Sequence, residues 1–285
     1  MLQEVRSLGF EYAELGHGTR ISLVPGIMAA VDAGEIKISS VHNFCPLPMG
    51  VTHAAPNIYQ LSSERPRERE LAERQTLKTM EFAVRIGAPM VIMHLGSIDM
   101  KDYTDRLLEL AGNGEKDTPK YQRLCTEFEE KREQKKEPFF ERVKESMKRL
   151  LPEAESRGLK LCAESRQALE ELPADSDFQF LFRELTSPSL VYWHDTGHTQ
   201  IKENLGFLQH TMQLETLQEW LAGFHINDVQ YPGRDHCSPG TGGVDFGSLK
   251  GMVRDHHVKV LELSPSLTAE EIVSGWDHMK KVWGE

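Results

Sequence analysis

The chain has 285 residues, with 33 lysines and arginines against 44 aspartates and glutamates, and a formal net charge of -11. This balance excludes a general electrostatic attraction to nucleic-acid phosphates or anionic lipid, so we expect neither nucleic acid nor a membrane as a partner. No stretch approaches the roughly 18 apolar residues of a membrane span, and the first residues lack the apolar core of a signal peptide. Because α/β barrels of about 250 residues are single domains, we expect one domain over residues 1–285.

The four cysteines lie far apart in the sequence and form no CxxC pair; they are Cys45, Cys125, Cys162 and Cys237. This spacing argues against a zinc knuckle and against a dense disulfide scaffold. A reducing, cytoplasmic location is therefore the expectation.

Short apolar runs alternate with longer charged, amphipathic runs, which is typical of βα units around a parallel sheet. Seven strands are predicted, at residues 12–18, 36–44, 89–97, 159–165, 189–198, 223–229 and 256–265. Helices are predicted between them, for example over 67–87 and 137–158, where Gly87 and Gly158 occupy C-terminal cap positions. The charged stretch 112–137 is expected to be a solvated loop and an exposed helix.

The chain begins directly in a predicted helix, so an eighth strand is missing ahead of it. The sequence therefore predicts the α/β class and a TIM (β/α)8-type barrel that lacks its first strand. An unpaired edge strand exposes backbone groups and favours association. We expect that side of the barrel to be covered by a neighbouring chain, as in a homodimer, or by residues not in this numbering.

Metal-capable side chains close most of the predicted strands; they are His42, His94, Glu164, Asp195, His198, His225 and Glu262. In parallel α/β barrels the chemistry lies at these C-terminal strand ends. Glu164, Asp195, His225 and Glu262 follow one another at separations of 31, 30 and 37 residues, close to the roughly 31 residues of one βα unit. One donor per successive strand is therefore predicted.

Three of these four donors are carboxylates, which would repel one another inside a barrel mouth unless a cation neutralised them. Taken singly, a His or Glu at a strand end is more often a hydrogen-bonded structural residue or a loop-capping group. Together, Glu164, Asp195, His225 and Glu262 form an oxygen-rich set with one nitrogen. Such a set suits one divalent metal ion, Mn²⁺ or Mg²⁺, with Zn²⁺ or Co²⁺ as alternatives.

The motifs around these donors resemble the xylose isomerase-like TIM barrel superfamily, the sugar phosphate isomerase/epimerase group that also includes endonuclease IV. The motifs are LCAES at 161–165, WHDTGH at 193–198, HIND at 225–228, PGRDHCSPGTGGVDF at 232–246 and VLELSP at 260–265. The resemblance runs from Leu2 to Trp283. It implies that the four donors bind one metal and that Glu164 and Glu262 also transfer protons.

The resemblance further implies that His198 and Arg234 contact substrate oxygens, and we assign His42 and His94 to substrate binding as well. A base, an acid and a Lewis acid are what a proton shift through an enediolate requires. The predicted function is a metal-dependent isomerase or epimerase of a small sugar, sugar phosphate or keto-polyol. The same residues serve both reactions.

Three alternatives stay open. A dehydratase or lyase of a keto-polyol would use the same metal and base. An endonuclease IV-type zinc phosphodiesterase would need ligands for three zinc ions, and further candidates are His42, His94, His198, Asp235 and His236. Against it, the D-x-H pair of that family is here an adjacent Asp235–His236, and no basic, aromatic-interleaved stretch suits a duplex. A non-catalytic sugar-binding barrel is the third.

A glycine-rich segment, PGTGG, lies at 239–243. It is shorter than a GxGxxG phosphate cradle, and Pro-Gly and Gly-Gly pairs are typical of turns. We interpret it as a tight loop ahead of the next helix.

Overall fold

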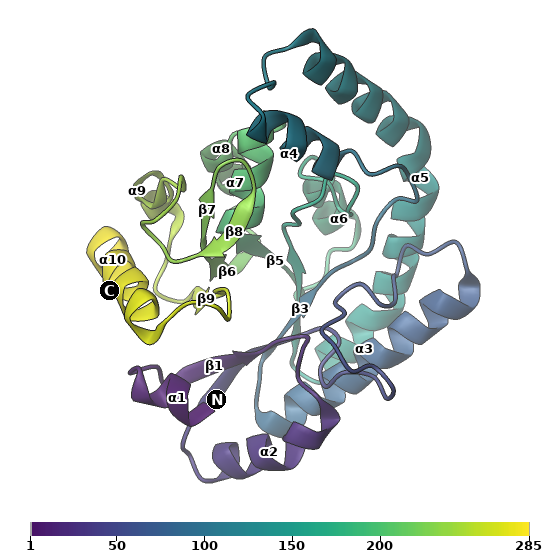
Figure 1. Ribbon diagram of the computed structural model, residues 1–285. Coiled ribbons are helices and arrows are strands. Elements are labelled where there is room, and N and C mark those ends of the chain that lie inside the picture. The colour runs from purple at the N-terminus through teal and green to yellow at the C-terminus, as the bar shows by residue number, and fades with distance from the viewer. Residues whose placement is uncertain (1, 285) are drawn as a thin grey trace. The chain divides into compact units, whose positions relative to one another are not determined.

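The computed structural model describes residues 2–284, and helices and strands alternate along them (Figure 1). Seven strands form one parallel sheet in the order β1-β2-β3-β4-β5-β6-β9. They are β1 Tyr12–Leu15, β2 Lys37–His42, β3 Met90–Met93, β4 Lys160–Glu164, β5 Leu190–Asp195, β6 Leu221–Ile226 and β9 Val258–Leu261. All seven lie inside or overlap the predicted strands. A separate antiparallel hairpin of β7 Asp228–Gln230 and β8 Arg234–Cys237 was not predicted.

The helices are α1 Leu2–Ser7, α2 Val24–Asp32, α3 Pro66–Ile86, α4 Thr104–Gly112, α5 Pro119–Ser156, α6 Phe178–Glu184, α7 Thr196–Leu205, α8 His210–Leu217, α9 Phe246–Leu249 and α10 Ala269–Trp283, with short 3-10 turns at Ile21–Leu23 and Lys250–Met252. The helix predicted over 67–87 matches α3 closely, whereas the helix predicted over 137–158 ends near the C-terminus of α5 but begins 18 residues too late. Gly87 ends α3 with a left-handed φ of 73°, and Gly158 follows α5 with a φ of 67°. Both positions favour glycine, because only glycine adopts this conformation without strain.

The chain divides into two compact units, each discontinuous in sequence. The first comprises Met1–Gly96, Glu141–Glu164 and Leu181–Val191, and the second comprises Ser97–Phe140, Ser165–Phe180 and Tyr192–Glu285. Strands β1 to β4 belong to the first unit, whereas β6, β9 and the hairpin belong to the second. A single domain over residues 1–285 stays a prediction.

The charged stretch 112–137 is more ordered than predicted. Most of it belongs to α5, a helix of 38 residues. Tyr121, Leu124 and Phe128 recur at helical spacing and pack with Leu107 of α4 in a buried cluster of the second unit. The prediction of an exposed helix is therefore correct only for the charged face of α5. The opposite face is buried through its apolar residues.

The missing first strand is confirmed for the described residues. Within 2–284, α1 precedes β1 and no strand lies ahead of it. β1 and β9 are the two ends of the strand order. What covers these ends stays a prediction. Among the same residues, no helix is both long and apolar enough to cross a membrane.

Candidate metal and substrate site

The four predicted metal ligands occupy equivalent places on four strands that are neighbours in the sheet. Glu164 is the last residue of β4, Asp195 is the last of β5, His225 lies in β6 and Glu262 directly follows β9. The strand order runs β4-β5-β6-β9. Each donor thus lies at the carboxyl end of its own strand, Glu164 in the first unit and the other three in the second.

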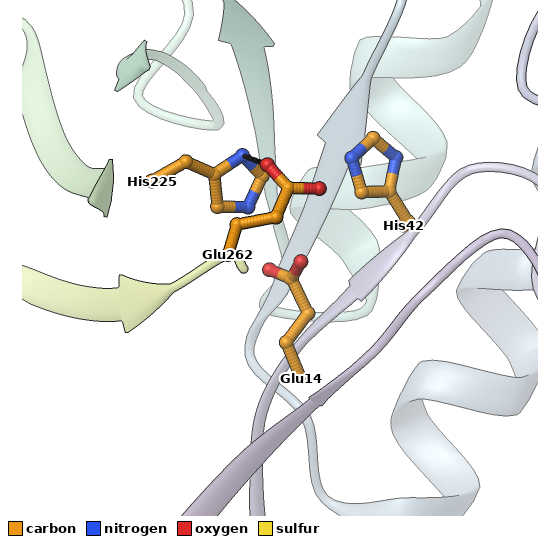
Figure 2. A group of neighbouring side chains, drawn as sticks. All are labelled: Glu14, His42, His225 and Glu262. Atoms are coloured by element: carbon orange, nitrogen blue, oxygen red, sulfur yellow. Dashed lines mark ion pairs between the residues drawn. The ribbon is translucent and has the colours of Figure 1, made fainter. Parts of the chain in front are cut away.

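In the second unit, Asp195, His225 and Glu262 form one group. Figure 2 shows the His225 ring and the Glu262 carboxylate facing each other, with His225 Nδ1 at 2.9 Å from Glu262 Oε2. Asp195 Oδ2 lies 3.8 Å from the same nitrogen. His225 and Asp195 are fully buried, and Glu262 is half-buried. Two carboxylates around one imidazole form an oxygen-rich donor set of the kind that hard divalent ions accept.

In the first unit, Glu164 lies between two histidines. Its Oε2 is 3.0 Å from His94 Nε2 and 3.7 Å from His42 Nε2, and all three side chains are buried. Asn57 Oδ1 lies 3.0 Å from His94 Nδ1, on the far side of that ring. The structure thus joins His42 and His94, which were assigned to substrate, to Glu164 in a nitrogen-rich group whose donor atoms lie within 4.8 Å of one another.

His17 and Glu14 are two further polar residues of the first unit. The His17 ring meets the His42 ring edge-on, with centroids 4.9 Å apart. Ser40 Oγ donates to Glu14 Oε2 at 2.6 Å. Glu14 on β1 and His42 on β2 are the other two side chains drawn in Figure 2.

A third group lies in the second unit, where His198, Asp235 and His236 bring donor atoms within 4.8 Å of one another. His236 Nδ1 is 3.1 Å from Asp235 Oδ1, and His198 Nε2 is 3.8 Å from Asp235 Oδ2. His236 has a φ of 53°, a left-handed turn that lets two adjacent residues serve one centre. The adjacency of Asp235 and His236 argued against the D-x-H ligand pair of an endonuclease IV-type site. With this turn, both side chains nevertheless reach the same group.

Opposite charges on Asp235 and His236 stabilise this third group. Burial lowers the pKa of His236, but hydrogen bonds to Asp235 and Glu262 and the charges of Asp195 and Asp235 outweigh it, raising the pKa to about 11. Burial likewise raises the pKa of Asp235, but the hydrogen bond and charge of His236, together with the charge of His198, bring it below the usual value. Without a metal, Asp235 and His236 are therefore an ion pair at neutral pH.

Arg234 and His198, the other predicted substrate contacts, differ in exposure. Arg234 is exposed on β8, and its guanidinium donates to Gln230 Oε1 at 3.4 Å within the same hairpin. His198 is buried at the start of α7, with Nδ1 at 3.1 Å from the Ser165 carbonyl oxygen. The substrate-binding roles of both residues stay predictions.

The PGTGG segment folds around a carboxylate of the protein itself. Asp228, the last residue of HIND, accepts backbone N–H groups of Val229, Gly240, Gly242 and Val244 at 2.8 to 3.0 Å. A fully buried carboxylate thus occupies the donors that an anion would need. The arrangement agrees with a tight loop.

The family model described as xylose isomerase-like TIM barrel matches residues 2–281. The chain belongs to this family. The predicted resemblance and the predicted TIM-barrel fold class, with seven strands among the described residues, are thereby confirmed. A search of curated proteins returned no match.

Solved structures similar to this xylose isomerase-like chain include sugar epimerases and xylose isomerase-like proteins. A D-tagatose 3-epimerase-like protein has 16% identity and a TM-score of 0.70, over 99% of this chain and 91% of that one. The 3-keto-D-glucoside 4-epimerase from E. coli has 12% identity and a TM-score of 0.67, over 98% and 92%. The D-psicose 3-epimerase from Clostridium cellulolyticum H10 has 15% identity and a TM-score of 0.67, over 99% and 92%. At these identities the likeness shows the fold.

Sequence reasoning missed the residues that support the donors. Ser165 Oγ accepts the backbone N–H of Asp195 at 2.9 Å, and Asn227 Nδ2 donates to the Asp195 carboxylate. Both residues lie inside the quoted motifs LCAES and HIND, beside a predicted ligand. The sequence shows that both residues lie near a predicted ligand. No spacing rule, however, predicts that their side chains contact Asp195 on a neighbouring strand.

Proposed function

We propose that this chain is a metal-dependent isomerase or epimerase of a small sugar, sugar phosphate or keto-polyol. The observation that carries the proposal is the Asp195, His225 and Glu262 group, in which two carboxylates approach one imidazole. We propose Glu164, at the end of β4, as the fourth donor, on the strength of the family resemblance. The family match and the epimerase neighbours support the same reading.

The donor set fits one divalent ion. Buried carboxylates are stable when a cation neutralises them, and Asp195 is fully buried. In the proposal, Glu164, Asp195, His225 and Glu262 hold this ion, with Mn²⁺ or Mg²⁺ favoured and Zn²⁺ or Co²⁺ as alternatives. The ion would supply positive charge beside the carbonyl and hydroxyl oxygens of the substrate.

Glu164 and Glu262 exchange the proton in this proposal. One glutamate, as the carboxylate, removes the proton next to the carbonyl, and the other, as the carboxylic acid, donates its own proton to the enediolate, which requires two groups on different sides of the substrate. The resemblance to the epimerases of this family, in which two such glutamates flank the substrate, supports giving the two roles to Glu164 and Glu262. Return to the opposite face gives an epimer, and return to the adjacent carbon gives an isomer.

Binding of the substrate oxygens is assigned to buried histidines and to one exposed arginine. His198 and His94 are buried and can donate to or accept from hydroxyl groups, and Arg234 would add a charged donor. The neighbouring structures are named for epimerisation of tagatose, psicose and a 3-keto-glucoside, which are small keto-sugars. We propose a substrate of this class.

The proposal is tested by incubating the Mn²⁺-supplemented protein with keto-sugars, their phosphates and inososes in deuterated water, with NMR of the products. We expect an epimer or isomer that carries deuterium on the carbon next to the carbonyl. A dehydrated product would indicate the lyase alternative. No turnover of any compound, despite bound metal, would contradict the proposal.

A second candidate, a three-metal phosphodiesterase, is favoured by a separate observation. Besides the proposed group, the structure gathers His42, His94 and Glu164 in the first unit and His198, Asp235 and His236 in the second. Three donor groups of this kind are what an endonuclease IV-type zinc enzyme would use. Hydrolysis of a nitrophenyl phosphodiester in the presence of Zn²⁺, with none of the keto-sugars converted, would decide for it.

A further inference from the structure

Asn227 of the HIND motif contacts the DTGH motif through its side chain. It follows β6 and is fully buried. Its Nδ2 donates to both carboxylate oxygens of Asp195, at 3.2 and 3.3 Å, and its Oδ1 accepts the backbone N–H of His236 at 3.2 Å. One amide thus links the proposed ligand on β5 to the turn that carries His236.

The chemistry of the two partners fixes how this amide is oriented. An ionised carboxylate can only accept, and a backbone N–H can only donate. Asn227 must therefore present its NH₂ group to Asp195 and its oxygen to His236, in opposite directions. An aspartate would lack the donor and a leucine of similar size would lack both groups.

Residues 196 and 197 hold Asn227 in place. Thr196 Oγ1 donates to the Asn227 carbonyl at 2.7 Å and accepts the Asn227 N–H at 3.0 Å. A Cβ atom at Gly197 would lie 1.9 Å from Asn227 Oδ1, a distance no packing can absorb without movement. The threonine and glycine of DTGH are thus accounted for by the asparagine of HIND.

The contacts of Asp195 show what this arrangement does. Its Oδ1 accepts the backbone N–H of His198 at 2.7 Å and so forms the N-cap of α7. Its Oδ2 lies 3.4 Å from His198 Nδ1 and 3.8 Å from His225 Nδ1. The amide of Asn227 bridges both oxygens and so restrains rotation of the carboxylate.

We propose that Asn227 is the positioning residue of the metal centre. It holds the Asp195 carboxylate with Oδ2 turned toward His225, while its other end fixes the His236 turn. This assignment rests on the proposed function, because it gives Asp195 the role of a ligand. Outer partners of metal ligands typically contribute about 10- to 100-fold in metal affinity.

The experiment measures Mn²⁺ binding by electron paramagnetic resonance of the free ion in Asn227→Leu and Gly197→Ala. The leucine preserves volume and removes both hydrogen bonds, and the alanine displaces the same amide from outside. Asn204→Leu is the matched control, since Asn204 lies near the C-terminal end of α7, where its Nδ2 donates to the Pro232 carbonyl oxygen and its Oδ1 accepts from Gln200. Gly26→Ala in α2 is the control for the glycine, since a Cβ there meets nothing within 4 Å.

We expect both test variants to bind Mn²⁺ about 10- to 100-fold more weakly and both controls to bind as the parent does. The double variant should lose about as much as Asn227→Leu alone, and the visible spectrum of bound Co²⁺ should change in the test variants. Circular dichroism of the metal-free variants separates this loss from unfolding. Parental affinity and an unchanged Co²⁺ spectrum in Asn227→Leu would overturn the assignment alone. A parental protein that binds no Mn²⁺ would overturn the proposed function, and this assignment with it.

Discussion

The donor groups of the two units differ in chemistry. The first unit offers two imidazoles and one carboxylate, from His42, His94 and Glu164. The group of Asp195, His225 and Glu262 in the second unit offers two carboxylates and one imidazole. Nitrogen-rich sets are typical of Zn²⁺, and oxygen-rich sets suit Mn²⁺ and Mg²⁺. The group in the first unit therefore favours the zinc phosphodiesterase, and the group in the second unit favours the Mn²⁺- or Mg²⁺-dependent isomerase or epimerase.

The largest expected effect comes from the two glutamates, one in each unit. Glu164→Gln and Glu262→Gln keep a ligating oxygen but remove the basic carboxylate, so metal should remain bound while turnover falls about 10²- to 10⁴-fold. Steady-state kinetics and metal analysis of the same preparations check this. Glu35→Gln, at an exposed turn, is the control. Near-parental turnover of both variants would make the glutamates ligands only.

Replacing one histidine in each unit should affect metal and substrate differently. In the proposal His225 is a ligand, whereas His94 contacts substrate. His225→Ala should weaken Mn²⁺ binding by more than the roughly 100-fold that outer-shell changes cost, while His94→Ala should keep the metal and raise KM. Mn²⁺ titration and kinetics measure the two effects. Loss of one zinc ion from His94→Ala would favour the three-metal candidate instead.

Stability against pH gives a smaller effect, at opposite ends of the scale. The pKa of His236 is raised to about 11 from an ordinary 6.5, so its stabilisation is complete below about pH 6.5 and is lost as pH rises toward 11. Burial, with the charge of Lys202, lowers the pKa of His210 to about 3. The folded protein keeps this histidine neutral and therefore loses stability as pH falls below about 6.5.

Urea denaturation of the metal-free protein should therefore show a maximum near pH 6.5. Between pH 6.5 and 4.5, His210 alone should reduce the free energy of unfolding by about 2 kcal/mol. His236→Asn should flatten the alkaline side and His210→Gln the acid side. A stability that is constant from pH 4.5 to 9 in the parent would show that neither histidine is held as described.

The smallest effect is expected from Arg234. Its side chain is exposed and donates to Gln230, so Arg234→Ala should change the free energy of unfolding by no more than about 0.5 kcal/mol. If it contacts the substrate, KM should rise several-fold while kcat stays close to the parental value. An unchanged KM would remove Arg234 from the predicted substrate contacts.

The strands could be predicted because apolar runs closed by polar residues are local features of the sequence. Glu164 and Asp195 do end β4 and β5. The β7-β8 hairpin could not be predicted, since its residues 228–237 show no apolar alternation and its shape depends on the turn at His236. Buried polar contacts such as Asn227 with Asp195 join different strands, and one sequence does not carry that information.

If this chain uses one divalent metal ion for proton transfer, its metal content and its turnover must rise and fall together. Protein purified without chelator should contain about one metal ion per chain by elemental analysis. Removal with a chelator should abolish sugar turnover, and one equivalent of Mn²⁺ should restore it. Three zinc ions per chain, or turnover that survives complete removal of metal, would contradict the account.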